Sequence, residues 1–245
     1  HLIVDEMQDY SMIQYLIIQR LFKCRMTILG DREQTMDGEQ QDVLTFLPKI
    51  FGKDIRRIVM NKSYRNTIEI ASYANQLAGI TEVELFERHG KPVEEKEFPG
   101  LIEALERVVK ELKLEKQAVT EAEADRMEMA DMETAGAEGQ EEFSYETAAV
   151  ITRTADEARE AYYILQKKLE AEGFDTKERL SLLHRDSTNF KKGLTVTTFY
   201  MAKGLEFDAV FIPETEKYVT PLHKQALYID ATRALHFLRL YEVQI

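Results

Sequence analysis

The sequence predicts an α/β fold with a mostly parallel sheet that is covered by helices on both faces. Apolar runs of strand length stand at residues 2–4, 147–151 and 209–212. Longer segments with apolar residues at helical spacings lie between them, as at residues 11–22 and 156–172. Strands that alternate with helices of this length form parallel sheets, because each helix carries the chain back to the starting edge.

Caps, apolar spacings and helix breakers predict the other elements. Ser11 is a suitable N-cap for the first helix, and Pro48 should interrupt or end a helix because it has no backbone N–H to donate. Residues 101–114 carry an apolar stripe that is typical of an amphipathic helix. We expect an irregular strand pair over residues 85–98. The remaining strands are expected at Arg25–Leu29, Ile55–Met60, Leu194–Phe199 and His236–Val243, and the remaining helices at Val43–Phe51, Thr67–Ala78 and Lys224–Ala234.

Composition favours an ordinary soluble protein. The 245 residues suffice for one large or two modest domains, and no uninterrupted apolar run approaches the length that spans a bilayer. The single cysteine, Cys24, excludes an intramolecular disulfide and fits a reducing compartment. We therefore expect a cytoplasmic protein without membrane attachment.

The negative charge of the chain is concentrated in one segment. The net charge is −12, and residues 111–142 hold eleven acidic against three basic residues. The rest of the chain is only about four units negative, so the whole-chain charge does not exclude a local basic track for nucleic acid. We expect residues 118–142 to form a solvated helix or a mobile insertion and not a site.

Two adjacent carboxylates follow the first apolar run. Asp5 and Glu6 come directly after Val4, and Asp9 lies three residues further on. At the carboxyl end of a strand, where open α/β sheets bind ligands, one carboxylate can hold a hydrated Mg²⁺ while the other accepts a proton from attacking water. Taken alone, these residues fit an acidic turn in solvent equally well.

Four more polar clusters stand at predicted strand or helix ends. Each has a simple structural explanation when it is taken alone: Gly30-Asp31 suits a turn, Tyr64-Arg65 a helix entrance, and Arg233 a cation near a helix C-terminus. Three histidines, His184, His223 and His236, lack the paired spacing of metal ligands and are treated as structural. The four clusters are Gly30-Asp31-Gln34, Tyr64-Arg65, Lys203 to Asp208, and Thr232-Arg233.

The order and spacing of the five clusters resemble motifs II to VI of the UvrD/Rep-type superfamily 1 helicases. The matching stretches are VDEMQD, GDREQ, NKSYRNT, TTFYMAKGLEFD and LYIDATRA. The resemblance implies a RecA-like P-loop NTPase fold. Residues 1–52 would be the end of a first RecA-like domain, and residues 53–245 a second one with an acidic insertion at about residues 112–145.

The resemblance also implies roles for individual residues, with ATP and Mg²⁺ as cofactors and single-stranded DNA as a partner. Asp5 resembles the aspartate that holds Mg²⁺, and Glu6 the base that orients the attacking water. Gln34 resembles the glutamine that senses the γ-phosphate, and Arg65 and Arg233 the arginines that reach it. Tyr64 matches the tyrosine that stacks on adenine. Glu206 matches the residue that binds the ribose, and Gly204 allows the backbone to approach closely. Thr198 and Tyr200 match the residues that touch single-stranded nucleic acid.

Two departures from the family pattern affect function. The sequence contains no Gly-x-x-x-x-Gly-Lys-Ser/Thr loop. We expect that loop upstream of His1 in a longer polypeptide, and we expect the chain alone to be inactive in ATP hydrolysis. The aromatic residue that usually follows the glutamine motif and stacks on a base is replaced by Thr35-Met36-Asp37-Gly38. Base stacking typically contributes about 1–3 kcal/mol per base, so strand separation is in question.

The short distance from Arg65 to Lys203 leaves no room for the large insertion domain of processive UvrD-type helicases. This spacing and the stretch Ala-Thr-Arg-Ala-Leu-His are similar to the HelD branch, whose members bind RNA polymerase and use ATP to release it from nucleic acid. Three hypotheses follow: a monomeric ATP-driven motor on single-stranded DNA or an RNA polymerase complex, a non-catalytic interaction module, and a metal-dependent nuclease built on Asp5, Glu6 and Asp9. The nuclease hypothesis is weakest because no second carboxylate or histidine cluster supplies another metal.

Overall fold

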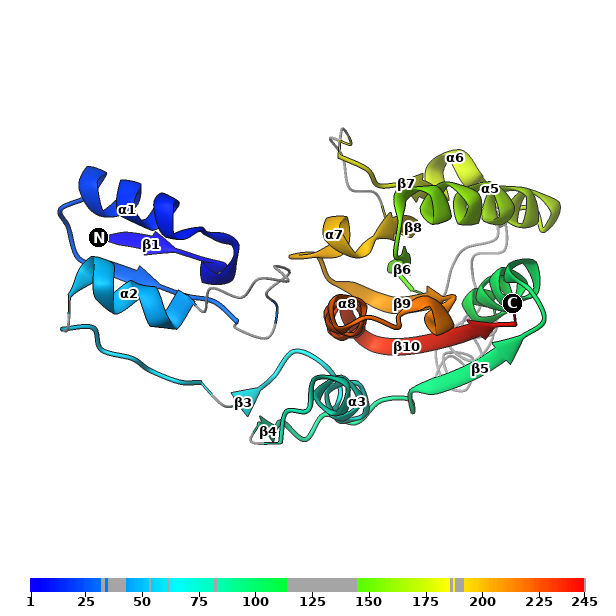
Figure 1. Ribbon diagram of the computed structural model, residues 1–245. Helices are drawn as coiled ribbons and strands as arrows, with labels where there is room; N and C mark the ends of the chain where they lie inside the picture. Colours follow the sequence, from blue (N-terminus) through cyan, green and yellow to red (C-terminus); the bar gives the residue numbers. More distant parts are fainter. Residues whose placement is uncertain are drawn as a thin grey trace, which may run out of the picture.

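The largest sheet among the described residues has six strands, and every neighbouring pair in it is parallel (Figure 1). Its strand order is β5-β10-β9-β6-β8-β7. The strands are β5 (Glu94–Phe98), β6 (Thr147–Thr152), β7 (Leu180–Leu182), β8 (Gly193–Thr198), β9 (Phe207–Pro213) and β10 (Ala234–Val243). The computed structural model describes residues 1–31, 34, 43–52, 54–60, 62–81, 83–113, 145–185, 187 and 192–244.

Helices cover both faces of this sheet, as alternation along its strands requires. Ala148 and Val150 of β6 lie in a buried cluster with α5 and the helix at residues 101–113, whereas Ala149 and Ile151 lie in a second cluster with α3, α7 and α8. The predicted α/β class is therefore confirmed. The helices near this sheet are α3 (Ile68–Ala78), α5 (Ala155–Ala171), α6 (Thr176–Arg179), α7 (Phe199–Ala202) and α8 (Pro221–Ala231).

A smaller set of elements precedes the six-stranded sheet and has a core of its own. The parallel pair β1 (Leu2–Val4) and β2 (Met26–Ile28) packs with α1 (Met12–Leu21) and α2 (Val43–Phe51). We call these elements, at residues 2–51, the N-terminal group, and those at residues 62–243 the main group; Figure 1 shows the two connected by an extended stretch of chain. The domain division after residue 52 stays a prediction. The buried apolar residues of the N-terminal group are Val4, Tyr15, Val43, Phe46, Leu47 and Ile50.

One predicted strand, Ile55–Met60, is wrong. Residues 54–60 form no strand, and the first strand of the main group is the two-residue β3 (Lys62–Ser63), which pairs with β4 (Glu84–Leu85). Met60 is 88% exposed. An apolar run becomes a strand only where a neighbouring strand and a buried face receive it, and this connecting segment has neither among the described residues.

The expectation that Pro48 interrupts or ends its helix is also wrong, because α2 continues through the proline to Phe51. The proline ring lies on the exposed side of the helix, and the buried residues Phe46, Leu47 and Ile50 hold the helix against the core. Packing of the apolar face thus outweighs the hydrogen bond that Pro48 cannot donate.

Residues 85–98 do not form the expected strand pair. β4 pairs with β3, and β5 joins the edge of the six-stranded sheet beside β10. The short elements α6, β7 and α7 were not predicted. The expected solvated insertion at residues 118–142 lies outside the described residues. In the described part of the chain, no helix is long and apolar enough to cross a membrane.

Candidate functional site

The end of β1 presents its two carboxylates through an unusual backbone turn. Glu6 has φ 53° and ψ 51°, a left-handed conformation that costs a residue with a side chain on the order of 1–2 kcal/mol. It leads into the 3₁₀ turn η1 (Met7–Asp9). The Asp5 carboxylate is exposed and accepts a hydrogen bond from the Glu6 N–H at 2.9 Å. The turn therefore directs two neighbouring acidic side chains away from the strand.

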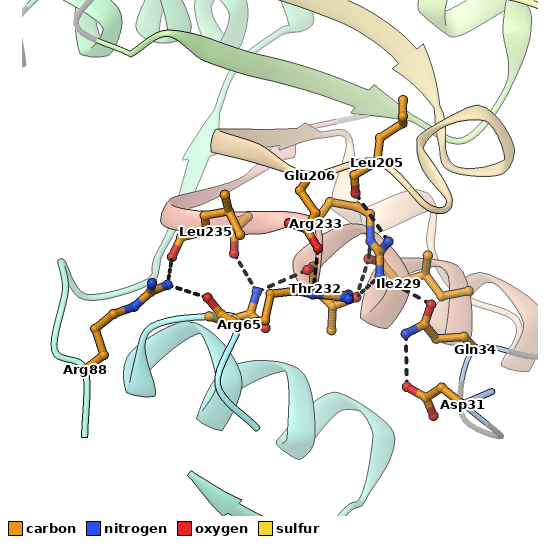
Figure 2. Close-up of polar contacts among 12 residues, drawn as sticks. Asp31, Gln34, Arg65, Arg88, Leu205, Glu206, Ile229, Thr232, Arg233 and Leu235 are labelled. Atoms are coloured by element: carbon orange, nitrogen blue, oxygen red, sulfur yellow. Dashed lines mark hydrogen bonds and ion pairs between the residues drawn. The ribbon is translucent and has the colours of Figure 1, made fainter. Parts of the chain in front are cut away.

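A series of hydrogen bonds connects Glu6 with Arg233 of the main group. Gln8 donates to the Glu6 carboxylate and accepts from the Asp31 N–H at 3.1 Å. Gln34 Nε2 donates to Asp31 Oδ2 at 3.0 Å, and Arg233 Nη2 donates to Gln34 Oε1 at 3.3 Å (Figure 2). The structure thus brings together three predicted site residues that are far apart in the sequence, namely Glu6, Gln34 and Arg233.

The turn after β2 needs a glycine so that this series can form. A Cβ atom on Gly30 would lie 2.4 Å from the Met7 side chain and 2.5 Å from Gln8 Oε1. The adjacent Met7 N–H donates to the Leu29 carbonyl at 2.8 Å, which holds the two strand ends together. Gly30 therefore lets the β1 and β2 ends approach closely.

Arg233 is almost completely buried, at 2% exposure, and is held by backbone carbonyls. Its Nε donates to the Ile229 carbonyl at 3.1 Å and its Nη1 to the Leu205 carbonyl at 3.3 Å. Its Nη2 also lies 3.1 Å from Thr232 Oγ1 (Figure 2). These contacts fix the orientation of the guanidinium group without neutralising its charge.

Charged groups of both signs act on the buried guanidinium group of Arg233. Burial lowers the pKa of Arg233 from its ordinary value, and the neighbouring charge of Arg65 lowers it further. Asp230, Glu206 and Glu6 act on this pKa in the opposite direction. An anion bound near both arginines would offset the repulsion between their guanidinium groups.

Asp230 is the buried acidic residue whose charge acts on Arg233. The side chain is fully buried, and burial raises the pKa of Asp230 well above its ordinary range, although Arg233 opposes the shift. The Tyr218 hydroxyl donates to Asp230 Oδ2 at a long 3.4 Å. A carboxyl group that favours its neutral form leaves the charge of Arg233 for another partner.

Arg65 and Tyr64 lie at the rim of the same region. Arg65 Nε forms a 2.7 Å ion pair with Glu206 Oε1, and both side chains are nearly half exposed. Tyr64 is 59% exposed, and its ring lies 5.4 Å from that of Phe86. An exposed aromatic face next to Arg65 in the sequence suits a flat ring attached to an anionic group.

Two residues that the sequence did not single out attach Arg65 to the Arg233 segment. Asn66 Nδ2 donates to the Thr232 carbonyl at 3.1 Å and to the Ala234 carbonyl at 2.6 Å. Arg88 donates to the Arg65 carbonyl and, at 3.0 Å, to the Leu235 carbonyl (Figure 2). The signal for Asn66 was its place between Arg65 and the helix N-cap Thr67, whereas nothing in the sequence marked Arg88.

The predicted nucleic-acid residues lie elsewhere, at the carboxyl end of β8. Thr198 ends that strand and is the N-cap of α7. Tyr200 on α7 is 57% exposed, and its ring centroid lies 3.9 Å from that of the buried Phe199. Gly204, just beyond α7, has φ +82° and no atom within 4 Å of a Cβ position, so its own backbone conformation requires the glycine.

The described residues offer few ligands for a metal ion at this site. Within the described ranges, no group of three or more His, Cys, Asp or Glu side chains could hold a metal ion. Mg²⁺ is typically bound through one or two carboxylates together with phosphate oxygens and water. The exposed Asp5 carboxylate could serve such an ion, whereas a nuclease site built on Asp5, Glu6 and Asp9 is not supported.

A family model described as the UvrD-like helicase C-terminal domain matches residues 193–241. The matched segment runs from β8 to β10 and contains Thr198, Gly204, Glu206 and Arg233. This part of the chain is therefore similar to a helicase C-terminal domain. A search of curated proteins gave no match.

Several solved structures resemble the chain at low identity. The C-terminal domain of a possible DNA helicase from Lactobacillus plantarum WCFS1 is 22% identical, with a TM-score of 0.48, and the match covers 74% of this chain and 88% of that one. A DNA complex of the arterivirus helicase nonstructural protein 10 is 13% identical, with a TM-score of 0.32, over 61% of this chain and 28% of that one. The DUF1998 helicase MrfA bound to DNA is 8% identical, with a TM-score of 0.46, over 99% and 29%. Likenesses at this level carry no argument about activity.

Proposed function

We propose that the chain is part of an ATP-dependent superfamily 1 helicase or translocase. The observation that carries this proposal is the hydrogen-bonded series from Glu6 through Gln34 to Arg233, which joins an acidic strand end to a buried arginine of another group of elements. The match of residues 193–241 to the UvrD-like helicase C-terminal domain supports the same class.

Each residue of the site then has a task in phosphoryl transfer. Bound ATP with Mg²⁺ supplies the phosphoryl group that water attacks. Asp5 would hold the ion, Glu6 would accept the proton of the water, and Gln34 would sense the γ-phosphate. Arg65 and Arg233 would stabilise the charge on the transferred group, Tyr64 would stack on adenine, and Glu206 would bind the ribose near Gly204.

Placing the acids and the arginines on different groups couples hydrolysis to motion. Glu6 belongs to the N-terminal group, and Arg233 belongs to the main group. Catalysis then requires the two groups to be closed on each other, and release of the products allows them to open. With single-stranded DNA held at Thr198 and Tyr200, repeated closing and opening of a monomer would move the strand.

Within this class we favour the HelD-like branch, whose substrate is RNA polymerase held on nucleic acid. The compact main group supports this choice. The described helices and strands between Arg65 and Lys203 pack in the six-stranded sheet and its covering layers, apart from the small β4. A motor without a large insertion domain suits displacement of a bound protein better than processive unwinding.

A non-catalytic interaction module is the second candidate. The observation in its favour is that the sequence contains no Gly-x-x-x-x-Gly-Lys-Ser/Thr loop to cradle phosphates. In that case the chain would bind a protein such as RNA polymerase and would show no ATP turnover in any longer form.

ATPase assays on the protein that carries this chain together with a phosphate-binding loop separate the two candidates. The motor proposal predicts turnover that single-stranded DNA or RNA polymerase stimulates and that Glu6→Gln abolishes. Unchanged turnover in Glu6→Gln would refute the role of Glu6, and absence of turnover in the unaltered protein would favour the interaction module. Stimulation by DNA alone, compared with co-purification of RNA polymerase, distinguishes the helicase-like from the HelD-like substrate.

A further inference from the structure

The four residues between α7 and β9, Lys203 to Glu206, contact three separate parts of the site. This segment is short, and the residue that follows it is fixed because the Phe207 N–H donates to the Arg233 carbonyl at 2.9 Å. Any displacement of α7 is therefore passed directly to the site residues. The three contacts are the ion pair of Lys203 with Asp9, the hydrogen bond from Arg233 to the Leu205 carbonyl, and the ion pair of Glu206 with Arg65.

The Lys203–Asp9 pair crosses between the main group and the N-terminal group. The Lys203 side chain is only 11% exposed, so its ammonium group is held in place, while Asp9 is 44% exposed. Asp9 is the last residue of η1, and its N–H donates to the Glu6 carbonyl at 2.9 Å. Lys203 thus holds the C-terminal end of η1, and Glu6 is the N-cap residue at the other end.

α7 connects Lys203 with the exposed ring of Tyr200. The helix has a single turn, and its residues Phe199 and Ala202 are buried in the core, so it moves with the core and not as a flexible loop. Tyr200 and Lys203 are three residues apart, which places them on neighbouring positions of that turn. A base that stacks on Tyr200 therefore acts on the same turn that positions Lys203.

We propose that Lys203 is a positioning residue whose ion pair with Asp9 couples contact of single-stranded nucleic acid at Tyr200 to the placement of Glu6. This inference rests on the proposed motor function and adds a specific route for nucleic-acid stimulation. A strand that stacks on Tyr200 bears on α7 and through it on Lys203, Lys203 holds Asp9, and η1 then keeps the Glu6 carboxylate in the orientation that catalysis uses.

The test is the ratio of ATP turnover with saturating oligo(dT) to turnover without it, in the protein that carries the phosphate-binding loop. Lys203→Gln and Asp9→Asn should each lower this ratio at least fivefold while the KM for ATP changes little. The charge-exchanged double variant, Asp9→Lys with Lys203→Asp, should recover most of the ratio. Lys224→Gln, at an exposed position of α8, is the matched control and should keep the full ratio.

The outcomes are distinguishable. If the unaltered protein shows no ATP turnover or no response to oligo(dT), the proposed function fails. If it responds and Lys203→Gln and Asp9→Asn respond equally well, the coupling role of the pair is overturned. If Lys203→Gln does not fold, Asp9→Asn carries the test alone because Asp9 is nearly half exposed. A charge exchange that recovers nothing while both single variants fold would also contradict an ion-pair mechanism.

Discussion

The loops that follow β1 and β9 share a backbone form and differ in chemistry. In each, a glutamate with left-handed backbone angles lies within two residues of the strand end, and one turn of 3₁₀ helix follows. Glu6 has φ 53° and precedes η1, and Glu214 has φ 56° and precedes η3 (Thr215–Lys217). A buried tyrosine lies against each loop: the Tyr15 hydroxyl donates to the Met7 carbonyl at 3.0 Å, and Tyr218 directly follows η3.

The two glutamates have different partners. Glu214 pairs with Lys217, whose Nζ also lies 3.8 Å from Glu157, and Glu157 pairs with Arg153 at 2.8 Å. These charges balance within the main group. Glu6 instead begins the hydrogen-bonded series that ends at Arg233. The same turn therefore presents an acid in both places, and the neighbouring residues decide whether that acid can act on a ligand.

Loss of the Arg233 cation should have the largest effect on ATP turnover. Arg233→Gln should lower kcat for ATP by about 10³-fold or more, which is the range of an arginine finger. Arg153→Gln removes the cation that follows β6 and pairs with Glu157 beside the β9 loop, and it should change kcat by less than about threefold. Steady-state ATPase assays measure both, with circular dichroism to confirm folding because Arg233 is buried. Equal losses of kcat in the two variants would contradict the claim that only the loop after β1 belongs to the site.

The two glutamates themselves should differ by about two orders of magnitude. Glu6→Gln should lower kcat by about 100-fold or more, since a general base contributes roughly 10²–10⁴-fold. Glu214→Gln keeps the same backbone and loses only the charge that pairs with Lys217, so turnover should stay within about threefold of the unaltered protein. Comparable activity of Glu6→Gln and Glu214→Gln would contradict the assignment of Glu6.

The free energy of unfolding should fall at high pH because of Tyr15, which contacts the β1 loop. Burial raises the pKa of Tyr15 to about 12, against about 10 in the unfolded chain. Because the folded pKa is the higher one, the stabilisation is fully present below pH 10 and is lost as the pH rises towards 12. Urea unfolding of the unaltered protein and of Tyr15→Phe should therefore show a difference in free energy of unfolding that shrinks over this window. A difference that stays constant between pH 9 and 12 would contradict the shift.

Glycine substitutions should show how much free energy of unfolding the left-handed conformation of Glu6 and Glu214 costs. Glu6→Gly should raise the free energy of unfolding by about 1 kcal/mol, because glycine adopts the left-handed region without strain. Glu214→Gly relieves the same strain but loses the ion pair with Lys217, so its net effect should be near zero. Chemical denaturation measures both. A destabilised Glu6→Gly would show that its side-chain contacts outweigh the strain.

Local patterns predicted most of the fold and the parts of the site that follow strand ends. Glu6 and Gln34 could be found because each comes soon after a short apolar run, and the alternation of strands with helices predicted a parallel sheet covered on both faces. The segment Ile55–Met60 was misjudged because strand formation depends on a distant partner that the local sequence does not reveal.

Contacts between distant segments could not be predicted from the sequence. The Lys203–Asp9 pair joins residues 194 positions apart, and Arg88 reaches Leu235 from a loop without a motif. These contacts arise only when the groups come together, and residue type alone does not distinguish Lys203 from any surface lysine. The resemblance to a helicase family named the residues of the site, and the structure added the residues that position them.

The measurement that tests the central claim most directly is a double-mutant cycle on Gln34 and Arg233 with ATP turnover as the readout. The structure places these side chains 3.3 Å apart across the two groups, as one working contact. The account predicts strong coupling: Gln34→Ala combined with Arg233→Gln should lose at least about tenfold less activity than the product of the two single losses. Losses that multiply within about twofold would mean that the two residues act independently, and this would contradict a single site closed by Arg233 upon Gln34.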